Sequence, residues 1–282
     1  MVAILFAKQL ARDTLRFGAT IGIEHTDINF MGNLALSLWD CGAQNDMMKS
    51  YLEERRQDVF SNVQVLIYVL DVESNELSEY EMYHDCLQAL LEFSPNALVF
   101  CLIHRIDLIQ EEQRDKVFRK KREKMQLLSS PKNVTYFATS IWDETLYKAW
   151  STIVHCLIPN IVTIETQLET FRKICGADEV VLFDRETFLV ISHSGNCDQE
   201  DEHRFEKVSN VIKQFRMSCS KIQSQFQSLQ VNQSDQNLSM VTFIEGFTSN
   251  TIIMIVVIDD TIQSEAIHLN IRQARKQFQT LL

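Results

Sequence analysis

Hydrophobic and polar positions alternate near the start of the chain and predict a β-hairpin. Residues 21–30 (IGIEHTDINF) alternate, and residues 34–39 (LALSLW) continue the pattern after Gly32-Asn33. A period of two is typical of strands with one buried face, and a Gly-Asn pair between two such runs favours a tight turn. We therefore expect two antiparallel strands in this region.

Longer apolar runs follow and predict a parallel sheet. Residues 63–72 (VQVLIYVLDV) and 98–103 (LVFCLI) are almost continuously apolar, as in strands buried on both faces, and residues 134–138 form a weaker run. Helical periodicity separates and follows these runs, over residues 76–93, 111–128 and 143–157. Strands that alternate with helices indicate a mostly parallel α/β sheet.

The pattern changes around Pro159-Asn160 and predicts a second domain with an antiparallel sheet. The expected elements are a helix over 164–175, strands 179–183 and 187–193, a long amphipathic helix over 202–229, strands 239–247 and 251–258, and a helix over 264–281. We place the boundary after residue 160. The predicted domains are therefore 1–160 and 161–282.

Charge and cysteine content narrow the functional classes. The formal net charge of −11 argues against non-specific binding to nucleic acid or anionic membranes. No apolar run approaches the ~20 residues of a membrane span, so we expect no direct membrane insertion. The 7 cysteines include no CxxC pair and indicate reduced thiols. The basic run 119–122 (RKKR) is interpreted as a solvated helix face.

The end of the second expected strand carries candidate phosphate chemistry. Asp40 is followed by Gly42, Ala43 and Gln44. One interpretation is an ordinary strand exit. In the other, Asp40 holds magnesium through water, the next turn brings a backbone N–H to a γ-phosphate, and Gln44 orients an attacking water. Thr20, just before the hairpin, can offer its hydroxyl to the same magnesium ion.

Later strand ends carry candidate base-binding residues. The strand 98–103 runs into His104 and Arg105, with Asp107 close behind. A carboxylate at Asp107 can accept hydrogen bonds from a guanine ring N–H and its exocyclic amine, and the stem of Arg105 can lie along the base. Backbone N–H groups at Ser140 and Ile141 can meet a base carbonyl. Together with the phosphate-binding candidates, these groups favour a nucleoside-triphosphatase site.

Several segments resemble the Rag family of GTPases, of the RagA/RagB type. They are ARDTLRFGATI, NLALSLWDCGAQ, VQVLIYVLDVES, CLIHRIDLIQEEQRD, TSIWDETLYKAW and HRFEKVSNVIKQF, and the resemblance covers essentially the whole chain. It implies an α/β protein with a Ras-like GTPase domain followed by a roadblock-type dimerisation domain. It also implies obligate pairing with a RagC/RagD-type subunit. The pair would sit on the lysosome or vacuole through a scaffold complex and relay amino-acid sufficiency to TOR complex 1.

The resemblance also implies roles for individual residues and a cellular location. Thr20 and Asp40 would hold magnesium, and Gln44 would position the hydrolytic water. Contacts to GTP or GDP are expected from Thr20, Asp40, Gly42, Ala43, His104, Arg105, Asp107, Ser140 and Ile141. The expected location is the cytoplasm and the lysosomal surface, with the nucleus as an alternative.

The chain departs from the family pattern in three places. None of the 7 glycines belongs to a GxxxxGK[ST] phosphate-binding loop, Ala43 replaces the glycine of DxxGQ, and Arg105 replaces a lysine. The central strand that precedes this loop in Ras-like sheets would also be missing, unless the apolar N-terminal stretch fills its place. These departures leave three hypotheses open. They are a Rag-type regulatory subunit with slow GTP hydrolysis, a nucleotide-independent interaction module, and a strand and loop encoded upstream of Met1.

Overall fold

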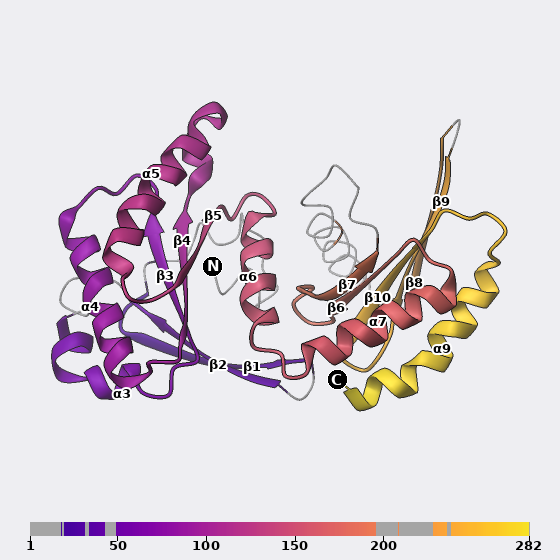
Figure 1. Ribbon diagram of the computed structural model, residues 1–282, viewed down its shortest axis with the longest axis horizontal. Helices are drawn as coiled ribbons and strands as arrows, with labels where there is room; N and C mark the ends of the chain where they lie inside the picture. Colours follow the sequence, from indigo (N-terminus) through magenta and orange to yellow (C-terminus); the bar gives the residue numbers. More distant parts are fainter. Residues whose placement is uncertain are drawn as a thin grey trace. The chain divides into compact units, whose positions relative to one another are not determined.

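The chain folds into two compact units (Figure 1). The computed structural model describes residues 18, 20–31, 34–42, 49–195, 208, 228–235 and 238–281, and the structural statements below concern these residues. Within them, the first unit contains 18, 20–26, 38–42 and 49–149, and the second contains 27–31, 34–37, 150–195, 208, 228–235 and 238–281. The division at 160/161 into independently folding domains stays a prediction.

The first unit contains the parallel sheet that the apolar runs predicted. Strands β3 (Val65–Asp71), β4 (Leu98–His104) and β5 (Val134–Thr139) lie in the order β3-β4-β5, and both neighbouring pairs are parallel. β4 is central and is buried from Val99 to Ile103. The helical elements of this unit are η2 (Ser50–Glu54), α3 (Arg56–Phe60), α4 (Leu77–Phe93), η3 (Ile106–Leu108), α5 (Glu111–Ser129) and α6 (Thr145–His155), which continues into the second unit.

A hydroxyl network and two thiols lie in the core of the first unit. Ser129 Oγ is 2.7 Å from the hydroxyl of Tyr83 and 2.8 Å from that of Tyr136, so α4, α5 and β5 share one polar contact point. Burial raises the pKa of the Cys86 and Cys101 thiols to about 12. The described cysteines are free.

The predicted hairpin is present and forms its own two-stranded sheet. Strands β1 (Ile23–Phe30) and β2 (Leu34–Cys41) pair with each other. Three cross-strand contacts are the backbone bond from Gly42 N to Gly22 O at 2.8 Å, the ring contact of Trp39 with His25, and the bond from Ser37 Oγ to Asp27 Oδ1. From one contact to the next, the residue number on β1 increases by as much as the number on β2 decreases. This pattern shows that the two strands are antiparallel. In the described part of the chain, no strand joins this sheet to β3.

The second unit contains a five-stranded antiparallel sheet. Its strands are β6 (Glu179–Asp184), β7 (Val190–Gly195), β8 (Ser228–Asp235), β9 (Leu238–Gly246) and β10 (Thr251–Val257), in the order β7-β6-β10-β9-β8. Helices α7 (Ile161–Cys175) and α9 (Ser264–Leu281) pack beside each other against it (Figure 1). Phe171 on α7 and Phe278 on α9 meet Phe247 in a ring cluster, with centroids 4.9–6.4 Å apart.

Strand β8 corrects one prediction. Residues 228 and 229 were assigned to the end of a helix over 202–229, but they begin β8. Val208 is helical, and the rest of that predicted helix lies outside the described residues. The sequence of β8, SLQVNQSD, has only two apolar side chains. An edge strand needs few buried positions, and a polar strand of this kind resembles a loop in sequence.

Candidate functional site

The three parallel strands end together on a row of polar residues. Asp71, His104 and Thr139 are register partners at the carboxyl ends of β3, β4 and β5. His104 Nδ1 lies 2.9 Å from Thr139 Oγ1, and burial lowers the pKa of His104. Carboxyl ends of strands are where open α/β sheets bind ligands. His104, one of the predicted site residues, therefore lies at this edge of the sheet, beside Asp71 and Thr139, which the sequence did not single out.

Asp107 and Ser140, two predicted base contacts, are brought into direct contact. Asp107 lies in the short helix η3, and Ser140 Oγ donates to Asp107 Oδ1 at 2.5 Å. Ser140 is fully buried, its backbone N–H donates to Thr145 Oγ1, and its hydroxyl accepts from Trp142 N. The carboxylate of Asp107 is thus held in one orientation. Such a carboxylate fits the paired N–H donors of a guanine edge.

Arg105 has a role that the sequence did not reveal. Its backbone adopts the left-handed conformation with φ 63°, which is uncommon for a residue other than glycine and is often found at functional sites. Its guanidinium lies 2.5 Å from Asp71 Oδ2 and 3.7 Å from Glu73 Oε2. Asp71 was missed as a site residue. Its position as an acid at the end of a buried strand is the same signal that singled out Asp40.

Lys121 contradicts the prediction that the basic run is a solvated face. Its side chain is only 6% exposed, whereas Arg119, Lys120 and Arg122 are exposed. Lys121 Nζ donates to the carbonyl oxygens of Asp71, at 3.2 Å, and Ser74. Burial lowers the pKa of Lys121. The reason is geometric, because one residue in each helical turn of α5 faces the sheet whatever its charge.

The candidate phosphate and magnesium groups meet at the base of the hairpin. Thr20 Oγ1 donates to Asp40 Oδ2 at 3.4 Å. Gly42 lies so close that a Cβ on it would stand 2.3 Å from the carbonyl oxygen of Thr20. A hydroxyl and a carboxylate are the oxygen ligands that Mg²⁺ accepts alongside water and phosphates. Ala43 and Gln44 lie outside the described residues.

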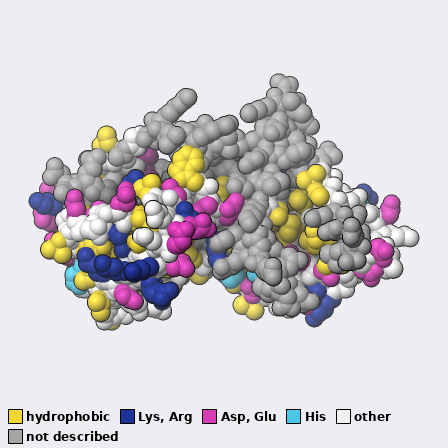
Figure 2. Space-filling view, turned by 90° about the horizontal axis from the view of Figure 1, so that it is seen from above, with side chains coloured by type: hydrophobic (Ala, Val, Ile, Leu, Met, Phe, Trp, Pro, Cys, Tyr) yellow, Lys and Arg dark blue, Asp and Glu magenta, His cyan; other side chains and the backbone are white. Residues whose placement is uncertain are grey.

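Other surfaces of the described chain add no further ligand set. No three His, Cys, Asp or Glu side chains among the described residues form a metal-binding group. No described helix is long and apolar enough to cross a membrane. On the face shown in Figure 2, the described basic side chains have acidic ones nearby, so this face is not uniformly basic.

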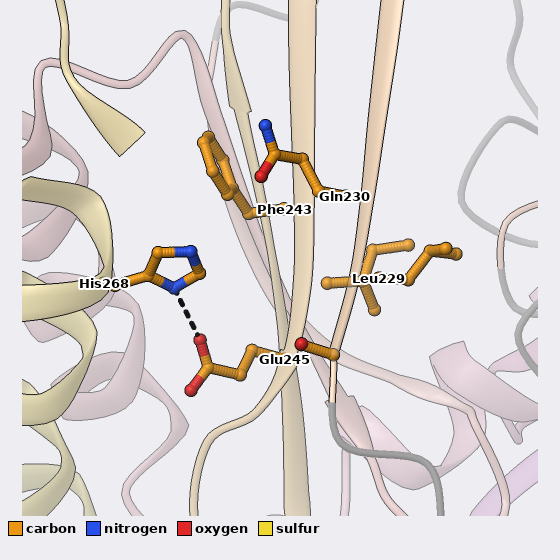
Figure 3. Close-up of a pocket in the computed structure, with 7 residues that line it drawn as sticks. Leu229, Gln230, Phe243, Glu245 and His268 are labelled. Carbon is orange, nitrogen blue, oxygen red and sulfur yellow. Dashed lines mark hydrogen bonds and ion pairs between the residues drawn. The ribbon is translucent and has the colours of Figure 1, made fainter. Parts of the chain in front are cut away.

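A small hollow in the second unit is lined by polar groups that bind each other. His268 on α9 points to Glu245 on β9, with Nδ1 3.0 Å from Oε2 (Figure 3). Arg275 donates to the other oxygen of Glu245 at 2.6 Å. The lining residues are Ser228, Leu229, Gln230, Phe243, Ile244, Glu245 and His268. We assign the Glu245 cluster to packing of α9 on the sheet.

Comparisons with known proteins place the chain among small G proteins. Residues 1–212 match the family model described as Gtr1/RagA G protein conserved region. The chain is 50% identical to Ras-related GTP-binding protein A of Dictyostelium discoideum over 283 residues, which cover 100% of this chain and 93% of that protein. It is 39% identical to GTP-binding protein GTR1 of Saccharomyces cerevisiae, with 99% and 93% covered. Ras-related GTP-binding protein C of Homo sapiens matches more distantly, at 24% identity over 64% of this chain and 46% of that protein.

Proposed function

The chain belongs to the Gtr1/RagA family of G proteins, and on this basis we propose that it is a guanine-nucleotide-dependent regulatory subunit. Its fold is the one that the resemblance implied, a Ras-like domain followed by a roadblock-type domain. The function proposed here is regulatory rather than metabolic. It combines nucleotide binding at the first unit with subunit pairing through the second.

The held carboxylate of Asp107 is the observation that carries the nucleotide proposal. Ser140 donates to one oxygen of this carboxylate at 2.5 Å, so the group that would read guanine is oriented before any ligand arrives. In this proposal His104, Arg105 and Ile141 surround the base, and Gly42 and Ala43 approach the phosphates. GTP or GDP is the ligand class.

At the other end of the site, we propose that Thr20 and Asp40 hold magnesium and that Gln44 orients water for hydrolysis. The pair Thr20–Asp40 supplies a hydroxyl and a carboxylate 3.4 Å apart. Bound magnesium would neutralise phosphate charge there. Ala43 in place of glycine opposes both close approach to a γ-phosphate and backbone freedom, so hydrolysis would be slow.

We further propose that the partner is a RagC/RagD-type subunit. The distant match to Ras-related GTP-binding protein C, at 24% identity over 64% of this chain, supports this proposal. The heterodimer would lie on the cytoplasmic face of the lysosome or vacuole, held by a scaffold complex, and would relay amino-acid sufficiency to TOR complex 1. A partner would supply the membrane attachment.

The alternative is a nucleotide-independent interaction module. The absence of a GxxxxGK[ST] motif from the 282 residues favours the interaction module. The names of the relatives described above favour nucleotide binding, because these relatives are called GTP-binding proteins. The two functions differ in whether the base-reading end of the site recognises guanine at all.

Saturation-transfer NMR separates the two functions, because it detects binding even at millimolar affinity. With the 282-residue chain and excess GDP, we expect signal transfer to the guanine H8 proton, and little transfer to the adenine protons of ADP. Asp107→Ala should abolish the GDP signal, whereas Asp115→Ala, which removes an exposed acid on α5, should retain it. Equal transfer to GDP and ADP, or equal signals in both variants, would favour the interaction module.

A further inference from the structure

The loop after β4 turns sharply at Arg105 and carries Asp107, the proposed guanine reader. β4 stays in register with β3 as far as His104. Arg105 then adopts φ 63° and ψ 33°, in the left-handed region. Beyond this turn Ile106 is buried, and Asp107 accepts from Ser140 Oγ at 2.5 Å. The backbone conformation of Arg105 therefore directs where Asp107 lies.

The short helix η3 also depends on Arg105. The carbonyl oxygen of Arg105 accepts from Leu108 N at 3.0 Å, and that of Ile106 accepts from Ile109 N at 3.0 Å. A left-handed backbone is unfavourable for a residue with a Cβ, so other interactions have to offset its energy. Burial of Ile106 in an apolar cluster is one of them, and the ion pair of Arg105 with Asp71 is another.

Asp71 offers Arg105 an oriented acceptor on the adjacent strand. Arg105 Nη1 donates to Asp71 Oδ2 at 2.5 Å. The other oxygen, Oδ1, accepts from Glu73 N at 2.9 Å, so the turn after β3 orients the carboxylate. The carbonyl oxygen of Asp71 accepts from the buried Lys121. Glu73 Oε2 adds a second negative charge 3.7 Å from Arg105 Nη2. Two acids thus hold the guanidinium at the end of β3.

The exposure of the pair sets the size of its contribution. The side chains of Arg105 and Asp71 are 51% and 32% exposed. Water and salt screen ion pairs of this kind, so the pair should change the population of the ordered loop by about two- to fivefold. The pair therefore adjusts a loop that the core also supports through Ile106.

We propose that Asp71 is a positioning residue for guanine recognition. By pairing with the guanidinium of Arg105, it favours the left-handed backbone that places Asp107 at the base. The part of this inference that concerns guanine rests on the proposed function. The pairing and its effect on η3 are properties of the ligand-free chain, so they are measured without nucleotide.

Amide hydrogen exchange, followed by NMR on the ligand-free 282-residue chain, tests the pairing. Asp71→Asn keeps an oxygen for Glu73 N but removes the charge that Arg105 binds. Exchange at the amides of Leu108 and Ile109 should accelerate about two- to fivefold, whereas the amides of β4 should keep the wild-type rate. Because salt screens the pair, about 1 M NaCl should accelerate the wild type and leave Asp71→Asn unchanged.

Substitutions at Arg105 separate positioning from general stability. Arg105→Ala loses the guanidinium and keeps a Cβ, so it should match or exceed the acceleration of Asp71→Asn. Glycine adopts the left-handed conformation without a steric cost, so Arg105→Gly should stay within about twofold of the wild type. Adding Asp71→Asn to Arg105→Gly should then change nothing further, because no guanidinium remains to be held.

Glu92→Gln is the matched control. It removes the partner of Arg56, an ion pair of the same unit at 3.2 Å, and should leave exchange at Leu108 and Ile109 unchanged. The proposal is overturned if Asp71→Asn leaves both amides at the wild-type rate. It is also overturned if Asp71→Asn accelerates them equally with arginine or glycine at position 105, or if the control has the same effect.

A GDP titration followed by saturation-transfer NMR connects the pairing to recognition. Asp71→Asn should weaken the apparent affinity for GDP by about two- to fivefold, in step with the loss of ordered loop. Faster exchange at η3 with unchanged GDP affinity would overturn the role in recognition. Absence of a GDP signal from the wild type would refute the proposed function instead, and the exchange rates would still decide whether Asp71 holds the loop.

Discussion

Replacement of Lys121 by methionine should destabilise the first unit more than any other change in the basic run. The substitution keeps the apolar stem but removes the ammonium that donates to the carbonyl oxygens of Asp71 and Ser74. These carbonyls lie where α5 covers the end of β3, and Lys121 itself is 6% exposed. Water has little access to replace the lost donor.

The magnitude follows from what each carbonyl group loses. The Asp71 carbonyl still accepts from the backbone N–H of Ser74 at 3.2 Å, whereas the Ser74 carbonyl loses its donor, which costs about 1–3 kcal/mol. Removal of a buried charge offsets part of this free-energy cost, because burial disfavours the charged form of Lys121 and lowers its pKa. We expect a net loss of about 1–2 kcal/mol, which corresponds to roughly a 5 °C fall in Tm for a unit of this size.

Urea unfolding and thermal melting, followed by circular dichroism and by the fluorescence of the tryptophans, measure the change. Lys120→Met is the control, since Lys120 is the exposed neighbour in the same helix and its loss should stay within ~0.5 kcal/mol. If the two variants lose equal stability, or if Lys121→Met loses less than the control, the ammonium is solvated and the burial argument is wrong.

Three further outcomes are expected. The 282-residue chain, without GxxxxGK[ST], should bind GTP more weakly than micromolar, and calorimetry that finds tighter magnesium-dependent binding would contradict this. The isolated segment 161–282 should fold and pair with a RagC/RagD-type C-terminal domain, and a monomeric elution beside that partner in size-exclusion chromatography would refute the pairing. Because burial lowers the pKa of His104 below its unfolded value of about 6.5, protons favour the unfolded state, so stability should fall as pH drops below ~6.5. His104→Asn should flatten that dependence in urea titrations from pH 7 to 5.

Periodicity predicted the sheets because burial imposes it directly. The continuous apolar runs became β3 and β4, and the alternation at 21–39 became the hairpin. The sequence pattern did not predict strand β8, because only one side chain in four of this edge strand is apolar and no periodic signal results. A polar strand is specified by its neighbour β9, to which it pairs over its full length, and that information is non-local.

Some residues of the candidate site could also be predicted from the sequence, and others could not. Strand-end acids are readable from sequence, so Asp40 and Asp107 could be named as candidates. The partners that orient them were less readable. Asp71 and Arg105 are 34 residues apart and meet because β3 pairs with β4. Lys121 is 50 residues from the Asp71 carbonyl and reaches it because α5 packs beside the sheet. Asp184, which accepts from the backbone N–H of Met31, lies 153 residues away from it.

The buried cysteine thiols can report on the unfolding of each unit, because they become reactive only when that unit opens. Cys86 and Cys101 lie in the core of the first unit with a pKa of about 12, and Cys175 lies in the second unit with its pKa raised to about 11. At neutral pH their thiolate fraction is on the order of one in ten thousand or less, and alkylating reagents cannot reach them in the folded state. Exposed Cys156 reacts at once and marks the starting point. When labelled peptides are followed with time, the order in which Cys101 and Cys175 gain mass tells which of the two units opens first.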